Sequence, residues 1–194
     1  MEPEERPESQ FAKLLRERFN QLPAIDQKYF HYGSLIVGLS ASASGLLSNK
    51  IFRETLKVRR GFLLSSLVVT SLPLFQTTIL YHTAIPNSIM AGKMNCPLCN
   101  TLRGTTVGAV VGGLGSASLA ALVSTMYFLK YNKKPLPNDA FRFCINLYRS
   151  AVMRMKYFFL FQAVLCMAVS ARYYAVYEKM LLMPPLQHEE GPKE

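Results

Sequence analysis

The chain has few acidic residues, few cysteines and several long stretches with almost no charged side chain. It carries 12 Asp and Glu against 22 Lys and Arg in 194 residues, and half of its residues are hydrophobic. The Lys and Arg residues are concentrated in residues 50–60 and 130–156. A nucleic-acid-binding domain presents its basic residues on one surface, whereas this segregation along the chain is typical of a membrane protein. We therefore expect no nucleic-acid partner.

Ionisable residues are also missing from the apolar stretches, apart from His31 and His82 near their ends. Pumps and coupled transporters usually keep charged groups at membrane depth, so a pump is not expected. The chain also lacks a Walker loop, a dinucleotide-binding fingerprint, a metalloprotease helix and a nucleophile elbow. We predict that it is not an enzyme, with no catalytic, cofactor-binding or metal-binding residue, no cofactor and no small-molecule substrate.

Four apolar stretches are long enough to cross a bilayer, whose hydrocarbon core of about 30 Å needs about 20 helical residues. They predict membrane spans at about residues 30–49, 61–82, 104–129 and 155–177. Pro73 should kink the second span, and the fourth needs Lys156 and Arg172 to reach outward from its ends. The expected fold is an all-α membrane protein, a four-helix transmembrane bundle with short amphipathic helices before the first and fourth spans.

These spans divide the chain into three parts. Residues 1–29 form a polar N-terminal tail with an amphipathic helix, residues 30–183 a single transmembrane domain, and residues 184–194 a polar C-terminal tail. The amphipathic helix either lies on the bilayer or is a solvated lead-in to the first span. The distribution of Lys and Arg places the basic loops on the inner side of the membrane, and both termini and the 83–103 loop on the other side.

A small residue recurs at every fourth position of the third span: Gly104, Gly108, Gly112, Ser116, Ala120 and Ser124. Small residues allow two helix backbones to approach closely, which is a main source of helix association in lipid. The pattern predicts a helix-packing face, used either inside the protein's own bundle or as a docking face for a partner subunit. The first span offers Gly38, Ala41, Ser42 and Gly45 as one candidate surface opposite it.

Cys96 and Cys99 are the only cysteines close together in the sequence, and they form either a disulfide or a pair of thiols. Structural zinc needs four ligands, and no second pair lies nearby. A redox role would favour the pair at the start of a helix in a βαβ unit, for which the sequence gives no sign. Cys144 and Cys166 are expected to be ordinary buried thiols.

A second two-faced helix is expected before the fourth span. Arg142, Arg149 and Lys156 repeat every seven positions beside a stripe of apolar residues. These cations either contact anionic membrane lipid or an acidic partner, or they only set the topology of the loop.

The order of several short motifs carries a family resemblance. The motifs are Asn20-Gln21-Leu22-Pro23, Tyr32-Gly33-Ser34, Gly45-Leu46-Leu47-Ser48-Asn49, Leu72-Pro73, the pair Cys96 and Cys99, Gly112-Gly113, and Lys130-Tyr131 before Pro135-Leu136-Pro137. In this order they resemble the transmembrane protein 126 family of the mitochondrial inner membrane, over about residues 20–182. The cysteine pair favours the A-type branch, while Tyr174-Ala175-Val176 followed by Glu178 resembles the end of the B-type branch.

The resemblance implies a non-enzymatic, multi-pass protein of the mitochondrial inner membrane that helps to assemble the membrane arm of respiratory complex I. Its partners would be membrane-arm subunits and other complex I assembly factors. The basic loops would then lie in the matrix, and the termini and the 83–103 loop in the intermembrane space. Two alternatives are a small transporter or channel, with a polar path from Gln76, Thr77, Thr78, Gln162 and the serines, and a thiol-redox protein that uses Cys96 and Cys99.

Overall fold

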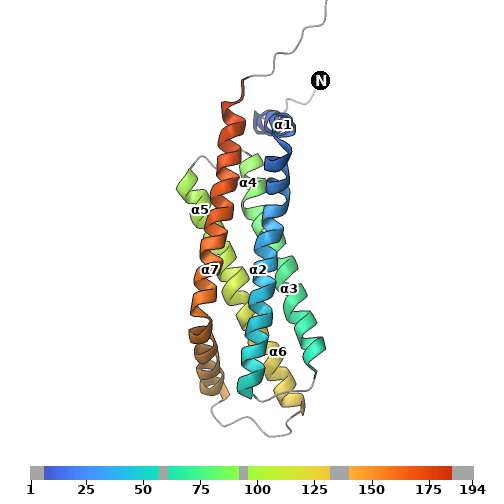
Figure 1. Cartoon of the computed structure of the whole chain (residues 1–194), viewed down its shortest axis with the longest axis vertical. Helices are drawn as coiled ribbons and strands as arrows, with labels where there is room; N and C mark the ends of the chain where they lie inside the picture. Colours follow the sequence, from blue (N-terminus) through green and yellow to red (C-terminus); the bar gives the residue numbers. More distant parts are fainter. Residues whose placement is uncertain (1–6, 57–60, 92–95, 132–139, 185–194) are drawn as a thin grey trace, which may run out of the picture.

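The computed structural model is a bundle of long helices that run side by side, and its described residues contain no strand (Figure 1). It describes residues 7–56, 61–91, 96–131 and 140–184. A shorter helix, α1 (Pro7–Asn20), lies across one end of the bundle.

Four helical passes make up the bundle. The first is α2 (Ala24–Leu56), and the second is α3 (Phe62–Ala84) with the short α4 (Pro86–Met90). The third consists of α5 (Pro97–Thr106), the π-helix η1 (Val107–Gly115) and α6 (Ser116–Tyr131), and the fourth is α7 (Ala140–Leu182). Each pass contains a helical stretch long and apolar enough to cross a membrane, which confirms the predicted all-α, four-span architecture.

The helices extend beyond the predicted spans. The sequence pattern predicts an amphipathic helix separate from the fourth span, but the structure joins the two in α7, a single helix of 43 residues. No Gly or Pro interrupts the sequence between Ala140 and Leu182, so nothing in the backbone chemistry ends the helix there. At about 1.5 Å per residue, α7 is about 65 Å long, and its ends project beyond a hydrocarbon core of about 30 Å.

Two clusters of buried hydrophobic side chains lie toward opposite ends of the bundle. At the end where α1 lies, Phe30 of α2 packs edge-on against Tyr173 of α7, with ring centroids 5.0 Å apart. Leu15 of α1 is fully buried in this cluster, so α1 is part of the packed structure. At the other end, Phe52 of α2 packs with Val69 of α3.

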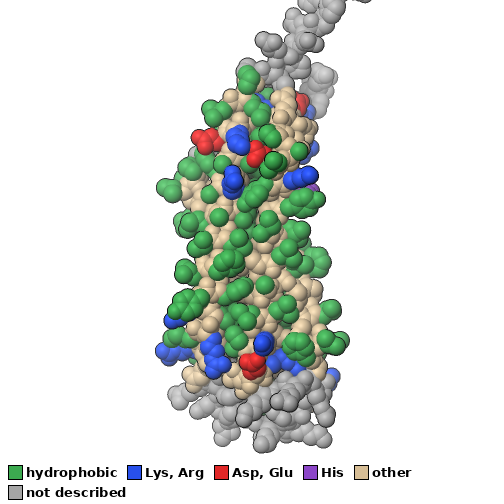
Figure 2. All heavy atoms as spheres, viewed as in Figure 1, with side chains coloured by type: hydrophobic (Ala, Val, Ile, Leu, Met, Phe, Trp, Pro, Cys, Tyr) green, Lys and Arg blue, Asp and Glu red, His purple; other side chains and the backbone are tan. Residues whose placement is uncertain are grey.

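The outer surface of the bundle is largely apolar in its middle. On the face shown in Figure 2, the described Lys, Arg, Asp and Glu side chains gather toward the two ends, and hydrophobic side chains occupy the band between them. Such a band suits contact with lipid tails, while the charged ends suit contact with headgroups and water.

Candidate functional site

Three glycines of the third pass face α7 inside the bundle. An added Cβ would overlap or crowd one α7 side chain at each glycine: Gly104 meets Ser170, Gly108 meets Cys166 and Gly112 meets Gln162. These α7 residues are themselves four positions apart, so the two helices interlock at regular spacing. We call this contact the interhelical seam, defined by Gly104, Gly108 and Gly112 with Ser170, Cys166 and Gln162.

The remaining residues of the predicted packing face are also inside the molecule. Ser116 is 1% exposed and Ala120 is fully buried. Hence all five residues proposed as a packing or partner face are covered by this chain's own helices. A partner subunit would have to open the bundle to reach them.

The first span packs along η1 and α6 of the third pass, but not through its two glycines. Gly38 and Gly45 instead let α2 approach α3, because an added Cβ would meet Leu74 O at 3.0 Å from Gly38 and Val69 Cγ1 at 3.2 Å from Gly45. Ala41 does reach the third pass, since its Cβ lies 3.2 Å from the position of a Cβ on Gly112. The surface opposite the small residues is therefore shared by α7, which meets Gly104, Gly108 and Gly112, and α2, which packs along α6.

The middle of the third pass winds as a π-helix, η1, over nine residues. A π-helix closes its hydrogen bonds one residue later than an α-helix, and it is rare outside short bulges that often occur at functional sites. Its sequence, Val-Gly-Ala-Val-Val-Gly-Gly-Leu-Gly, is rich in glycine. Glycine restricts the backbone least, so a glycine-rich segment can adopt the π-helical winding. The glycines alone do not predict a π-helix from the sequence.

Tyr81 connects α3 to the seam by hydrogen bonds. Its hydroxyl donates to the Cys166 carbonyl oxygen at 3.1 Å and lies 2.6 Å from Ser170 Oγ. Asn100 of α5 donates from Nδ2 to the Ser170 carbonyl oxygen at 3.0 Å. Because lipid offers no competing water, bonds of this kind hold membrane helices in register.

Gln162 is a fully buried amide at the seam. Neither its Oε1 nor its Nε2 has a hydrogen-bond partner among the described residues, and the same is true of Thr77 Oγ1 and Thr78 Oγ1. Gln76 lies on the outer surface of α3, so the structure does not bring the two glutamines of the alternative transport path together.

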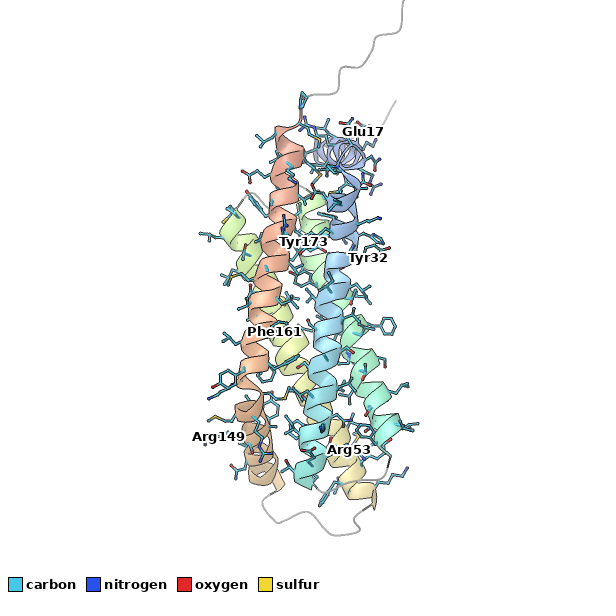
Figure 3. The ribbon with its side chains drawn as sticks, viewed as in Figure 1. Glu17, Tyr32, Arg53, Arg149, Phe161 and Tyr173 are labelled. Carbon is cyan, nitrogen blue, oxygen red and sulfur yellow. The ribbon has the colours of Figure 1, made fainter. Side chains whose placement is uncertain are left out.

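A polar cluster ties α2, α3 and α6 together at the opposite end of the bundle. Arg53 is 5% exposed and donates from Nη1 to Ser65 Oγ at 2.9 Å. Asn49 donates to Ser65 Oγ at 3.3 Å and accepts from Ser124 Oγ at 3.3 Å. Figure 3 shows Arg53 near this end. The sequence does not point to this cluster, because Arg53 stands among the basic residues of 50–60 and cannot be told apart from the other cations of that loop.

Cys96 and Cys99 lie at the start of α5, and both are thiols in this structure. Cys96 is the N-cap of α5, and its Sγ accepts a hydrogen bond from the Cys99 backbone N–H at 3.2 Å. Hydrogen bonding from the Cys99 side chain and from that N–H lowers the pKa of Cys96 below its ordinary value. The helix start that a redox pair favours is therefore present, although no strand accompanies it in the described residues.

The three cations predicted to contact lipid or a partner all fall on α7. Arg149 and Lys156 are exposed and line a shallow depression with Tyr148, Val152 and Met153. The side chain of Arg142 lies outside the described residues, as does that of Cys144. Residues 132–139 of the same basic loop are also outside, together with 1–6, 57–60, 92–95 and 185–194.

Exposed apolar side chains lie on all four passes, and on the third pass Leu98, Leu102, Leu122 and Met126 are each at least 62% exposed. On α3, Leu63, Leu64, Leu67, Phe75 and Ile79 are each at least 60% exposed, and on α7 so are Tyr157 and Leu160. The polar amide of Gln76 stands on the outer face of α3, directly beside Phe75.

Within the described part of the chain, no three His, Cys, Asp or Glu side chains group together in a way that could hold a metal ion.

Comparison with known proteins identifies relatives along nearly the whole chain. Residues 9–187 match the family described as transmembrane protein 126. Transmembrane protein 126A of Rattus norvegicus is 31% identical over 173 residues, which are 88% of each chain. Transmembrane protein 126A of Homo sapiens is 27% identical over 179 residues, 91% of this chain and 89% of the human one.

A relative of the B-type branch also matches. The protein of Mus musculus named complex I assembly factor TMEM126B, mitochondrial, is 29% identical over 122 residues, 58% of this chain and 53% of its own. No solved structure matches the chain. With the family match over residues 9–187 and four apolar helical passes, this chain belongs to the transmembrane protein 126 family.

Proposed function

We propose that this chain is a non-enzymatic assembly factor of the mitochondrial inner membrane, which helps to build the membrane arm of respiratory complex I through helix–helix contacts. The observation that carries the proposal is the relationship to TMEM126B proteins of mouse and rat, which are named complex I assembly factors. Its partners are membrane-arm subunits and other assembly factors of this complex. Anionic membrane lipids are further contacts.

The bundle itself limits where such a partner binds. The small residues of the third pass are covered by α7 and α2, so they hold the chain's own helices together. A partner helix therefore contacts an outer face of the bundle. Apolar exposure alone does not select that face, because lipid tails cover apolar side chains equally well.

Gln76 distinguishes α3 from the other outer surfaces. Its side chain is exposed, and it lies eight residues before Ala84, about 12 Å along the helix from its C-terminal end. No hydrogen bond joins its amide to another described residue. An amide that faces lipid at this depth is costly, whereas one that faces a neighbouring helix contributes a hydrogen bond. The outer face of α3 around Gln76 is our proposed partner contact.

The orientation follows from the charge distribution. The basic loops 50–60 and 130–156 lie in the matrix, and the termini lie in the intermembrane space. In Figure 3, Arg53 and Arg149 lie toward the end that this orientation places on the matrix side, and Glu17 lies at the other end.

Replacement of Gln76 by leucine tests this proposal. Gln76→Leu removes the amide from an exposed position, so the protein should fold and insert normally while recovery of complex I membrane-arm subunits with the tagged protein falls several-fold. Phe75→Leu is the matched control, because it changes an exposed neighbour without removing a polar group. Recovery at the wild-type level with Gln76→Leu would contradict the assignment of this face.

A further inference from the structure

A cavity of about 520 Å³ lies at the end of the bundle where α1 crosses the other helices. It is formed between α1, α2, α3 and α4. Four basic side chains line it, Arg16, Lys28, His31 and His82, together with the rings of Phe30 and Tyr32. Figure 3 shows Tyr32 on α2 toward this end. None of the predicted site residues of the sequence analysis lies in this cavity.

The charge of the cavity wall has one sign. No Asp or Glu is among the described residues that line it, and the described residues place no carboxylate within ion-pair distance of Arg16 or Lys28. Asp26, on the first turn of α2, bonds instead to Lys179 of α7 at 2.7 Å and lines a different cavity. The wall therefore suits an anion.

The position of the cavity along the membrane normal indicates which kind of anion it would meet. His31 and Tyr32 stand at the beginning of the predicted first span, and His82 stands at the end of the second, so the cavity lies where the hydrocarbon core gives way to headgroups. Aromatic rings such as Tyr32 are typical of this boundary.

Apolar side chains continue from the cavity toward the membrane centre. Ile36 and Leu39 lie one and two turns below Tyr32 on α2, and Ile79 lies one turn below His82 on α3, and all three are exposed. Since α2 and α3 pack along one another, these side chains form a lipid-facing surface directly beneath the basic wall. A phosphate group in the cavity would thus have room for its attached acyl chains.

We propose that this cavity binds the phosphate-bearing headgroup of an anionic phospholipid, with its acyl chains on α2 and α3. The Arg16 guanidinium and the Lys28 ammonium contact the phosphate, since charge-assisted hydrogen bonds to phosphate are the contacts these groups make best. The bound lipid would join α1 to the second pass, to which α1 otherwise makes contact mainly through α4.

Native mass spectrometry of the full chain tests the proposal. The protein is reconstituted with equal amounts of phosphatidylglycerol and phosphatidylcholine, extracted in mild detergent, and the retained lipid is counted. Wild-type protein should keep phosphatidylglycerol in preference, and Arg16→Gln with Lys28→Gln should lower its retention about tenfold. The matched control is Lys50→Gln with Arg154→Gln, which removes the same charge from two exposed positions toward the other end of the bundle, away from the predicted lipid contacts Arg149 and Lys156. Circular dichroism shows that each variant is folded.

Each outcome decides the matter. Loss of lipid only in the Arg16 and Lys28 variant supports the site. Equal retention in all three proteins, or an equal loss in both variants, overturns it, because the effect would then be absent or due to net charge alone. Inorganic phosphate is added as a competitor, and release of the bound lipid by millimolar phosphate would show that the cavity is a site for soluble anions, which would overturn the lipid assignment.

Discussion

Gly108 of η1 packs so closely against Cys166 of α7 that an added Cβ would overlap the sulfur and lie 2.8 Å from the Cys166 Cβ. Gly115, in the same π-helix, is exposed, and an added Cβ would only make an ordinary contact with Val110 O at 3.5 Å. These two glycines therefore separate the effect of packing from the effect of helix propensity.

We expect Gly108→Ala to lower the free energy of unfolding by about 1–3 kcal/mol, the usual cost of overpacking a core. Gly115→Ala should leave it unchanged or raise it slightly, because alanine favours helix over glycine. The measurement is denaturant unfolding in detergent micelles, followed by circular dichroism. Adding Cys166→Ala to Gly108→Ala should restore part of the loss; no recovery would mean that the two residues are not in contact.

Gln162 should be a source of instability, since its buried amide has no hydrogen-bond partner among the described residues. Gln162→Leu removes the desolvated polar atoms and keeps a similar volume, so the free energy of unfolding should rise by about 1–3 kcal/mol. Gln76→Leu is the control, because Gln76 is exposed and should change stability little. A fall in the thermal midpoint of the Gln162 variant would show that the amide makes a stabilising contact.

The sequence predicted the four spans because apolar length and charge segregation depend on local composition alone. It also predicted a packing face from the four-residue spacing of Gly104, Gly108 and Gly112, but not which helix lies opposite. That depends on tertiary arrangement, and the matching spacing of Ser170, Cys166 and Gln162 on α7 is a weak signal among many small and polar residues. The π-helical winding and the buried position of Arg53 likewise come from packing.

Tyr81 is expected to stabilise the contact between α3 and α7 through its hydroxyl. Tyr81→Phe removes the bonds to the Cys166 carbonyl and to Ser170 while keeping the ring, so we expect a loss of about 1 kcal/mol in the free energy of unfolding. Tyr32→Phe serves as the comparison, because Tyr32 is 53% exposed. Equal unfolding curves for the two variants would contradict a structural role for the Tyr81 hydroxyl.

Cys96 should react with alkylating reagents at lower pH than an ordinary cysteine. The hydrogen bond from the Cys99 side chain is the main cause of its lowered pKa, and a lower pKa means that the thiolate, the reactive form, is already present at lower pH. Cys99→Ala should therefore shift the rate profile of iodoacetamide modification at Cys96 toward higher pH. Site-resolved mass spectrometry gives that profile, and an unshifted profile would exclude Cys99 as the cause.

The most direct test of the proposed function is the composition of the native assembly. The tagged protein is purified from mitochondria in mild detergent, separated on a native gel and identified with its companions by mass spectrometry. We expect it to migrate in a large species together with complex I membrane-arm subunits and other assembly factors. Migration as a monomer or homo-oligomer without these proteins would contradict the proposed role in assembly.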